Sequence, residues 1–156
     1  MDGLMSSCIF CEIASGTREC HRIWEDEDHL AFLSSRPNTA GFTVVITKRH
    51  YSSYVFDLPD EMLSKLVLAA KQVGKLLDQR LEDVGRTGLI FEGFGVDHVH
   101  AKLFPMHGTG SMDEWHPIRS NVEKYFDSYE GYISSHDSKV WPAEKLAALA
   151  AKIRGD

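Results

Sequence analysis

Residues 97–104 (DHVHAKLF) carry the side chains in this sequence that are best suited to chemistry. If the stretch is a β-strand, its side chains alternate between two faces, so His98, His100 and Lys102 share one face and the apolar residues between them suit a core. Imidazole is a nucleophile and a proton carrier near neutral pH, and an ammonium group neutralises phosphate charge. The row therefore predicts a site for a phosphate group or a metal ion.

The simplest alternative is that this row is only the solvated face of an edge strand. Three glycines that bracket the stretch, Gly93, Gly95 and Gly108, favour a site instead, because a residue without a side chain lets the backbone approach a ligand closely. An outward row of histidines would also be an unexpected use of a strand whose reverse side is apolar. We therefore interpret the polar row as functional.

A second candidate site begins with Cys8 and Cys11, whose C-x-x-C spacing can present two thiolates to one zinc ion. Two cysteines supply only two of the four ligands that a structural zinc site needs, and two small residues in a turn would give the same spacing. His50, which ends the strand-like run FTVVITKRH, and His98 can supply the other two ligands. We predict a structural zinc site of these four residues. Cys20 could replace one ligand, but we interpret it as a plain buried thiol.

Short apolar runs predict the strands of a sheet around these residues. Two runs flank the acidic residues 25–28, which is the pattern of a hairpin over residues 21–33. Residues 42–47 (FTVVIT) are rich in β-branched side chains, which favours a buried strand. Residues 88–92 and 96–104 are further strand candidates, and the second of these carries the polar row.

One long helix and two short helical segments are expected beside the sheet. Apolar residues three and four apart over residues 59–81 form the stripe of an amphipathic helix, with Asp57 or Asp60 as its cap. Residues 8–16 predict a short turn or helix closed by a glycine, and residues 143–154 predict a short C-terminal helix. The order of elements favours an α+β fold with a mainly antiparallel sheet. A small α/β fold is the alternative, but the helices are too few for strict alternation.

Length and charge exclude several classes of protein. A chain of 156 residues, 43% hydrophobic and 26% charged, fits one globular domain. Its net charge of −6 disfavours a coat for bulk nucleic acid or an anionic membrane surface. No apolar run approaches the roughly 18–20 residues that span a bilayer, and no signal peptide is evident. An odd number of cysteines, three, fits a reducing cytoplasm better than a disulfide scaffold.

Four segments, in order along the chain, resemble the histidine triad (HIT) family of nucleotide hydrolases and transferases. They are CIFCEIASG, WEDEDHLAFL, GFTVVITKRH and HVHAKLFP. We therefore expect a single HIT-like domain over residues 1–156, with a core over about residues 8–107 and a C-terminal extension over 108–156. Residues 108–140 are rich in Gly, Ser, Trp and Tyr, which predicts a surface loop with buried aromatic side chains, or an interface.

The resemblance implies an activity and assigns roles to residues. Members of the family attack the α-phosphate of a nucleotide with the middle histidine of the triad, which is transiently nucleotidylated. This implies that His100 is the nucleophile. The first triad histidine is a zinc ligand in zinc-bearing members, which agrees with the role predicted above for His98. The resemblance also implies a nucleotide or dinucleotide substrate and a homodimer.

Several positions depart from the pattern of the family. Lys102 stands at the third triad position, Ser34 stands where an aspartate usually holds the ribose, and Phe94 stands where many members have glutamine. Glu92 falls near the place of an asparagine. These departures concern the expected substrate and catalysis and leave the expected fold unchanged. The candidate nucleotide-binding residues are Phe32, Ser34, Phe94 and His107.

Lys102 has two possible roles in this scheme, beside the nucleophile His100. It can neutralise the phosphate, which we favour because an ammonium on the same face is well placed for it, or it can donate a proton to the leaving group. The protein as a whole is then a nucleotide hydrolase or nucleotidyl transferase. One alternative is a nucleotide-binding module with weak or lost catalysis. Another is a catalytic metal site at His98, His100 and His107.

Overall fold

A five-stranded antiparallel sheet forms the centre of the computed structural model, which describes residues 8–121, 125–131 and 139–156. The strand order is β1-β2-β3-β5-β4, so β1 and β4 are the edges. The strands are β1 (His21–Glu25), β2 (His29–Leu33), β3 (Thr43–Thr47), β4 (Val84–Ile90) and β5 (His100–His107). The predicted α+β fold with a mainly antiparallel sheet is confirmed.

The predicted hairpin is formed by β1 and β2, with its turn at the acidic tip. A carboxylate oxygen of Asp26 accepts hydrogen bonds from the backbone N–H groups of Asp28 and His29, at 2.9 and 2.6 Å. Short polar side chains reverse the chain in this way because they satisfy backbone donors that no strand partner reaches. The turn sets the register that places all five residues of β2 in the interior.

Three α-helices surround the sheet: α1 (Ile9–Ser15), α2 (Asp60–Arg80) and α3 (Ala143–Arg154). A 3₁₀ turn, η1 (Val55–Asp57), precedes α2. The predicted aspartate cap of the long helix is wrong: Pro59 occupies the cap position and no side chain caps the helix. Asp60 instead lies in the first turn, where its charge favours the positive end of the helix dipole.

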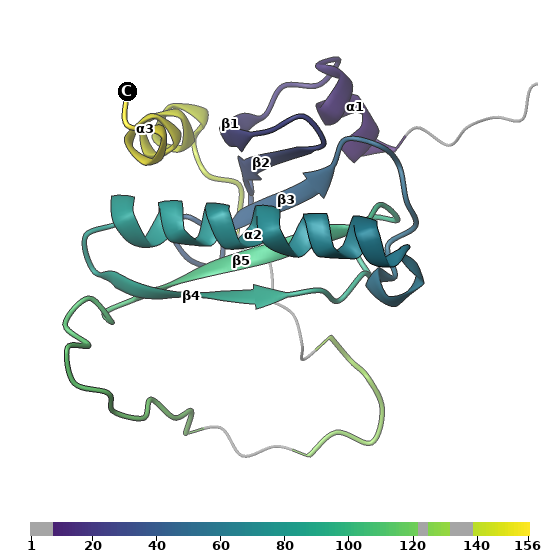
Figure 1. The fold of residues 1–156 in the computed structure, drawn as a ribbon. Helices are drawn as coiled ribbons and strands as arrows, with labels where there is room; N and C mark the ends of the chain where they lie inside the picture. Colours follow the sequence, from purple (N-terminus) through teal and green to yellow (C-terminus); the bar gives the residue numbers. More distant parts are fainter. Residues whose placement is uncertain (1–7, 122–124, 132–138) are drawn as a thin grey trace, which may run out of the picture.

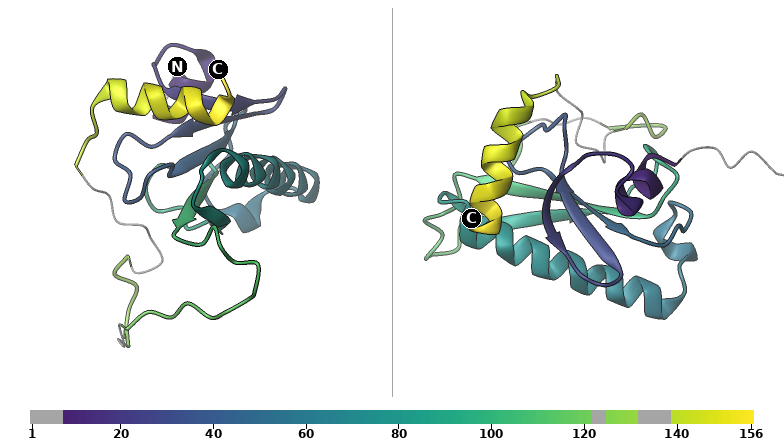
Figure 2. Two further views of the ribbon diagram at one scale, coloured as in Figure 1. Left: turned by 90° about the vertical axis from the view of Figure 1, so that its left-hand side faces the viewer. Right: turned by 90° about the horizontal axis from the view of Figure 1, so that it is seen from above.

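The two faces of the sheet are covered by different helices. In Figure 1, α2 runs across the front of the sheet, and its apolar stripe packs with residues such as Val45 and Ala101 in the larger core cluster. Helix α3 joins this cluster and packs beside β1. Helix α1 covers the opposite face, where Phe10 packs in a second cluster with Phe32 (Figure 2). The polar row of β5 therefore lies on the α1 side.

Strand β5 begins and ends later than the sequence predicts. It starts at His100 rather than at residue 96 and continues through Pro105 to His107. The chain before it bends, because the N–H of His98 donates to the carbonyl of Val96 at 2.8 Å and does not join the sheet. Pro105 is tolerated because β3 pairs only as far as Leu103, so one side of β5 needs no further N–H donors there.

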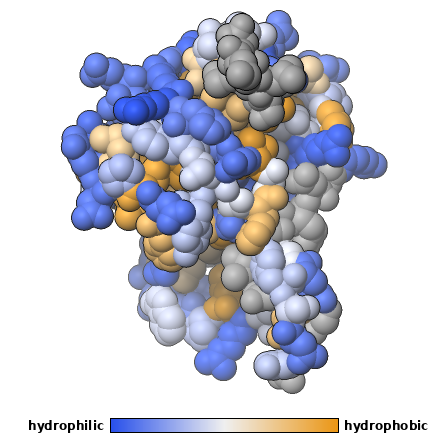
Figure 3. Space-filling model, turned by 90° about the vertical axis from the view of Figure 1, so that its right-hand side faces the viewer, coloured by the Kyte–Doolittle hydropathy of each residue, from blue (hydrophilic) through white to orange (hydrophobic). Residues whose placement is uncertain are grey.

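The segment after β5 leaves the body of the protein before the chain returns to α3. Figure 1 shows residues 108–121 of this segment lying away from the sheet, and Figure 3 shows a surface on which hydrophobic patches are separated by hydrophilic side chains. Trp115 and Tyr125 are 70% and 87% exposed, so these aromatic side chains are not buried as predicted. Within the described residues, no helix combines the length and the apolar character needed to cross a membrane.

Candidate functional site

Two cysteines and two histidines from three parts of the chain meet at one end of the sheet. Helix α1 and the residue before it supply Cys11 and Cys8, the end of the β3 segment supplies His50, and the bend before β5 supplies His98. The four candidate ligand atoms all lie within 4.8 Å of one another. The cluster could hold a metal ion, and the structure therefore brings together all four residues predicted for the zinc site.

The distances inside this cluster fit tetrahedral zinc. His98 Nδ1 lies 3.4 Å from Cys8 Sγ and 3.5 Å from Cys11 Sγ, and His50 Nδ1 lies 3.4 Å from Cys11 Sγ. Typical zinc–sulfur and zinc–nitrogen bond lengths at tetrahedral angles separate a sulfur and a nitrogen ligand by about 3.6 Å. The residues are thus spaced as ligands even though the cysteines come from one helical turn and the histidines from distant segments.

The protonation of His98 also suits a metal ligand. Its Nε2–H donates to the carbonyl oxygen of Thr47 at 2.7 Å, which leaves the Nδ1 lone pair facing the thiols. Burial lowers the pKa of the His98 imidazole and keeps the ring neutral. Burial and the adjacent Cys8 raise the pKa of the Cys11 thiol. A bound cation would lower this thiol pKa again, because it stabilises the thiolate form.

His100, the first residue of β5, is oriented by the same bend. Its Nδ1–H donates to the carbonyl oxygen of His98 at 2.7 Å, which leaves the Nε2 lone pair free of that bond. The ring is 5% exposed, and the edge of Phe10 packs against it at 5.0 Å between ring centroids. Burial lowers the pKa of the His100 imidazole, and the neighbouring Lys102 lowers it further. A neutral imidazole with one unprotonated nitrogen is the form that acts as a nucleophile.

Lys102 shares the face of β5 with His100, as the alternation of side chains predicts. Its ammonium donates to a carboxylate oxygen of Glu92 at 2.5 Å. The side chains of Lys102 and Glu92 are only 14% and 7% exposed. Burial raises the pKa of Glu92, but the hydrogen bonds from Lys102 and Tyr129 outweigh it, so the pKa is lowered overall and the carboxylate stays charged.

Glu92 connects the row to the segment after β5. Its second carboxylate oxygen accepts a hydrogen bond from the hydroxyl of Tyr129 at 3.0 Å. The Tyr129 ring in turn lies 5.3 Å from the ring of Phe94, measured between centroids. Phe94 is 78% exposed and stands on the tip of the loop between β4 and β5. An aromatic pair therefore borders the Glu92–Lys102 ion pair.

Two of the candidate nucleotide-binding residues lie on β2 or directly after it. Phe32 pairs with Val44 of β3, and Val44 pairs with Lys102 of β5. Phe32 and Lys102 therefore lie on the same face of the sheet, two strands or roughly 10 Å apart. Its side chain is buried against Phe10. Ser34 follows at the end of the strand, and its hydroxyl accepts a hydrogen bond from the N–H of Arg36 at 3.2 Å.

His107, in contrast, is not brought to this site. It is the last residue of β5, seven positions and roughly 23 Å along the strand from His100, with its side chain on the other face. Its ring nitrogens bond Asp83 and the carbonyl of Ala40, at 2.8 and 2.7 Å. A metal shared by His98, His100 and His107 is therefore ruled out by their placement.

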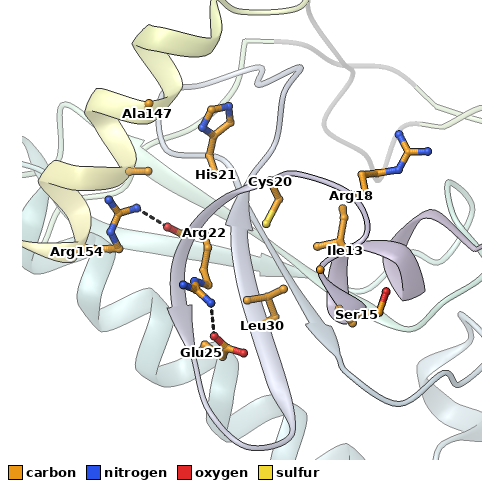
Figure 4. A pocket seen from close by; sticks show the side chains of 13 residues that line it. Ile13, Ser15, Arg18, Cys20, His21, Arg22, Glu25, Leu30, Ala147 and Arg154 are labelled. Carbon is orange, nitrogen blue, oxygen red and sulfur yellow. Dashed lines mark hydrogen bonds and ion pairs between the residues drawn. The ribbon is translucent and has the colours of Figure 1, made fainter.

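A separate cavity of about 690 Å³ lies between α1, β1 and α3, and none of the predicted site residues lines it. Its wall includes three arginines, and each is already paired: Arg22 contacts Glu25, Arg154 contacts Asp156, and Arg18 contacts Glu12. Figure 4 shows Arg154 also bonded to the backbone of Arg22. Such a cavity offers little net charge to an anion. Cys20 lines it, and burial raises the pKa of its thiol.

Sequence reasoning missed the part played by three residues. In the sequence, Glu92 stands out only as a departure from the family pattern, and no motif or period marks Tyr129 or Phe10 as part of the site. Glu92, in the loop after β4, is ten positions from Lys102 of β5, and Tyr129 is 37 positions from Glu92. A paired lysine in a triad position is the one signal that could have prompted a search for a nearby carboxylate.

Comparison with known proteins identifies the family of this chain. The family model of the HIT domain matches residues 15–109. This chain is a member of the HIT domain family. Among relatives, an uncharacterised HIT-like protein of Mycoplasma pneumoniae is 35% identical over 109 residues, which cover 67% of this chain and 75% of that protein. Adenosine 5′-monophosphoramidase hnt1 of Schizosaccharomyces pombe is 35% identical over 100 residues, which cover 64% of this chain and 74% of that protein.

The HIT fold extends over almost the whole chain. A crystal structure of a hypothetical histidine triad nucleotide-binding protein from Sulfolobus tokodaii superimposes with a TM-score of 0.70. The alignment covers 95% of this chain and 90% of that one at 23% identity. Membership of the HIT family supports a nucleotide-binding function of the hydrolase type for this protein.

Proposed function

We propose that this HIT protein hydrolyses, or transfers, the nucleotidyl group of a nucleotide through a covalent intermediate on His100. The observation that carries the proposal is the bond from His100 Nδ1–H to the carbonyl of His98, which aims an unprotonated Nε2 away from the strand. The adenosine monophosphoramidase relative favours a nucleoside phosphoramidate as substrate, while phosphoric anhydrides present the same α-phosphate.

In the proposed reaction His100 Nε2 attacks the α-phosphorus while the bond to the leaving group breaks. Burial keeps the imidazole neutral before attack, so the nucleophile needs no separate base to remove a proton. Water or another acceptor then attacks the phosphorus and releases His100. Lys102 is the second catalytic residue, because its ammonium lies on the same face as the nucleophile.

The Cys8, Cys11, His50 and His98 cluster is proposed to hold one structural zinc ion, which would tie α1 to the sheet. The spacing of the sulfur and nitrogen atoms and the free lone pair on His98 Nδ1 support this assignment. Because His98 also accepts the bond from His100 through its carbonyl, a fixed His98 holds the nucleophile in place.

A binding module with weak catalysis is the second candidate. It is favoured by Glu92, whose carboxylate lies beside the expected position of an anionic phosphate. It is also favoured by Ser34, since a serine can offer one hydrogen bond to a ribose but not the paired bonds of a carboxylate. In that case Phe32, Ser34 and Phe94 would still contact the nucleotide.

We also propose that the whole chain forms one HIT-like domain. Two copies would form a homodimer, and the protein would reside in a reducing cytoplasm. Val67 and Leu68 of α2 and Leu89 of the edge strand β4 are 40%, 57% and 44% exposed, which suits a contact between two copies. No disulfide joins the three cysteines, which all lie in the described part of the chain, and this suits a reducing compartment. Light scattering of the purified protein measures the oligomeric state directly.

Intact-protein mass spectrometry after incubation with adenine and guanine nucleotides tests the activity. We expect a nucleotidyl adduct on His100, together with released nucleoside monophosphate. The matched control is His116→Ala, which removes an exposed histidine outside the site and leaves the adduct unchanged. Binding of nucleotide with neither adduct nor product would instead support the binding module.

A further inference from the structure

We propose that Glu92 is a positioning residue that holds the Lys102 ammonium where it protonates the leaving group, and that Tyr129 holds Glu92. This inference rests on the proposed function and assigns a role to the segment after β5. It predicts that the contribution of Glu92 and Tyr129 to the rate grows with the basicity of the leaving group, because a basic leaving group needs a proton to depart.

The first support is the location of the ion pair. Lys102 and His100 are two residues apart on one face of β5, about 7 Å along the strand, so a phosphate on His100 is within reach of the lysine. The Glu92–Lys102 bond is 2.5 Å long and nearly buried. A buried ion pair confines the ammonium, since a charge without a partner is costly in the interior.

The second support is the charge of the pair. The Glu92 carboxylate offsets the charge of the ammonium, so together they present little net positive charge to a phosphate. This weakens the role of Lys102 as a neutraliser of phosphate. Proton donation depends on an acidic N–H group within hydrogen-bond reach of the leaving atom and not on a net positive charge.

The third support is the way in which Glu92 is fixed. The Tyr129 hydroxyl donates to its second oxygen at 3.0 Å, so both carboxylate oxygens are engaged. The next residue, Gly93, has φ of 77°, and an added Cβ would lie 3.0 Å from the carbonyl oxygen of Ser53. The turn that aims Glu92 toward β5 therefore requires a glycine.

The proton and electron balance of the step is simple. As His100 Nε2 forms a bond to phosphorus, the phosphorus–nitrogen bond to the amine breaks, and its electron pair stays on the amine nitrogen. That nitrogen takes a proton from Lys102, which becomes a neutral amine. Water then attacks phosphorus, the electron pair of the His100–phosphorus bond returns to Nε2, and Lys102 recovers a proton from the water.

The tertiary contact with Tyr129 also favours certain leaving groups. The exposed ring of Phe94 packs against the ring of Tyr129, whose hydroxyl is bonded to the Glu92 carboxylate of the ion pair. The expected substrate therefore has an amine that accepts the proton and an apolar or planar body that can rest against these rings.

The test uses the full-length protein and adenosine 5′-phosphoramidates of amines with graded basicity. We expect Glu92→Gln to lower kcat by about tenfold or more for the most basic amines and by less than about twofold for the least basic ones, with KM little changed. The matched control is Glu82→Gln, which breaks an exposed glutamate–lysine pair outside the site and leaves all rates unchanged.

A second variant keeps the test decisive if Glu92→Gln does not fold. Tyr129→Phe removes only the hydroxyl, and we expect about a threefold loss of kcat for the most basic amines. Its control is Tyr125→Phe at an exposed tyrosine in the same segment. An equal loss over the whole series, or none, overturns the role of Glu92. Absence of both turnover and His100 adduct in the unmodified protein overturns the proposed function as well.

Discussion

The Nδ1–H group of His100 donates to the carbonyl oxygen of His98 across 2.7 Å. The side chain of His98 belongs to the cysteine–histidine cluster, and its Nε2–H bonds the carbonyl of Thr47. One residue thus contributes its ring to the candidate metal site and its backbone carbonyl to the candidate nucleophile. The order of the cysteine–histidine cluster and the orientation of His100 therefore depend physically on each other.

His100→Ala is expected to abolish turnover while the fold survives. His100 supplies the imidazole at the nucleophile position, and loss of a covalent nucleophile lowers kcat by at least about a thousandfold. Rates with a phosphoramidate substrate and a circular dichroism spectrum measure the two effects. A variant that retains more than a tenth of the activity would refute the covalent mechanism.

Cys8→Ser is expected to remove the metal and to lower thermal stability more than it lowers nucleotide affinity. The cluster joins α1 to the bend before β5, so its loss frees the N-terminal helix. Elemental analysis of protein purified without chelator should find about one zinc per chain in the parent protein. Cys20→Ser, at a thiol outside the cluster, is the control and should retain the metal. Zinc-free parent protein of undiminished stability would contradict the assignment.

Glu92→Gln and Lys102→Met are each expected to reduce the free energy of unfolding, whereas the double variant should be less destabilised than the sum. Removal of one partner leaves a nearly buried polar or charged group without its counterpart, which costs about 3 kcal/mol. Denaturant unfolding of all four proteins measures the coupling. Additive effects would show that the two side chains do not interact in solution.

His107 is expected to make stability depend on pH. The hydrogen bond to Ala40 and the carboxylate of Asp83 raise the pKa of the His107 imidazole above its ordinary 6.5. A raised pKa in the folded state means that the stabilisation is complete below about pH 6.5 and is lost as pH rises through the folded value.

The same contact lowers the pKa of Asp83 below its ordinary 3.8. That contribution is present above about pH 4 and is lost only as pH falls further. The His107–Asp83 pair therefore stabilises the folded protein most between about pH 4 and about pH 6.5. Melting temperatures of the parent protein and of His107→Gln, both metal-loaded, should differ most near pH 5.5, and the difference should shrink as pH rises through the raised pKa of His107. A constant difference would contradict the raised pKa.

Much of the local structure could be predicted because it depends on near neighbours. The stripe of α2, the β1–β2 hairpin and the shared face of His100 and Lys102 all follow from periodicities of two to four residues. The two cysteines lie close because three residues make nearly one helical turn. The family pattern then implied which of these residues would meet.

Other features were decided only by the tertiary structure. Glu92 meets Lys102, and Tyr129 meets Glu92, because strand order and the path of a long loop bring distant segments together. No short-range period encodes such a path. His107 illustrates the converse: seven positions of extended chain carry it far from His100 and turn it to the other face. The sequence by itself thus determined the elements and the candidate nucleophile, and only the packing of the sheet decided which charges surround it.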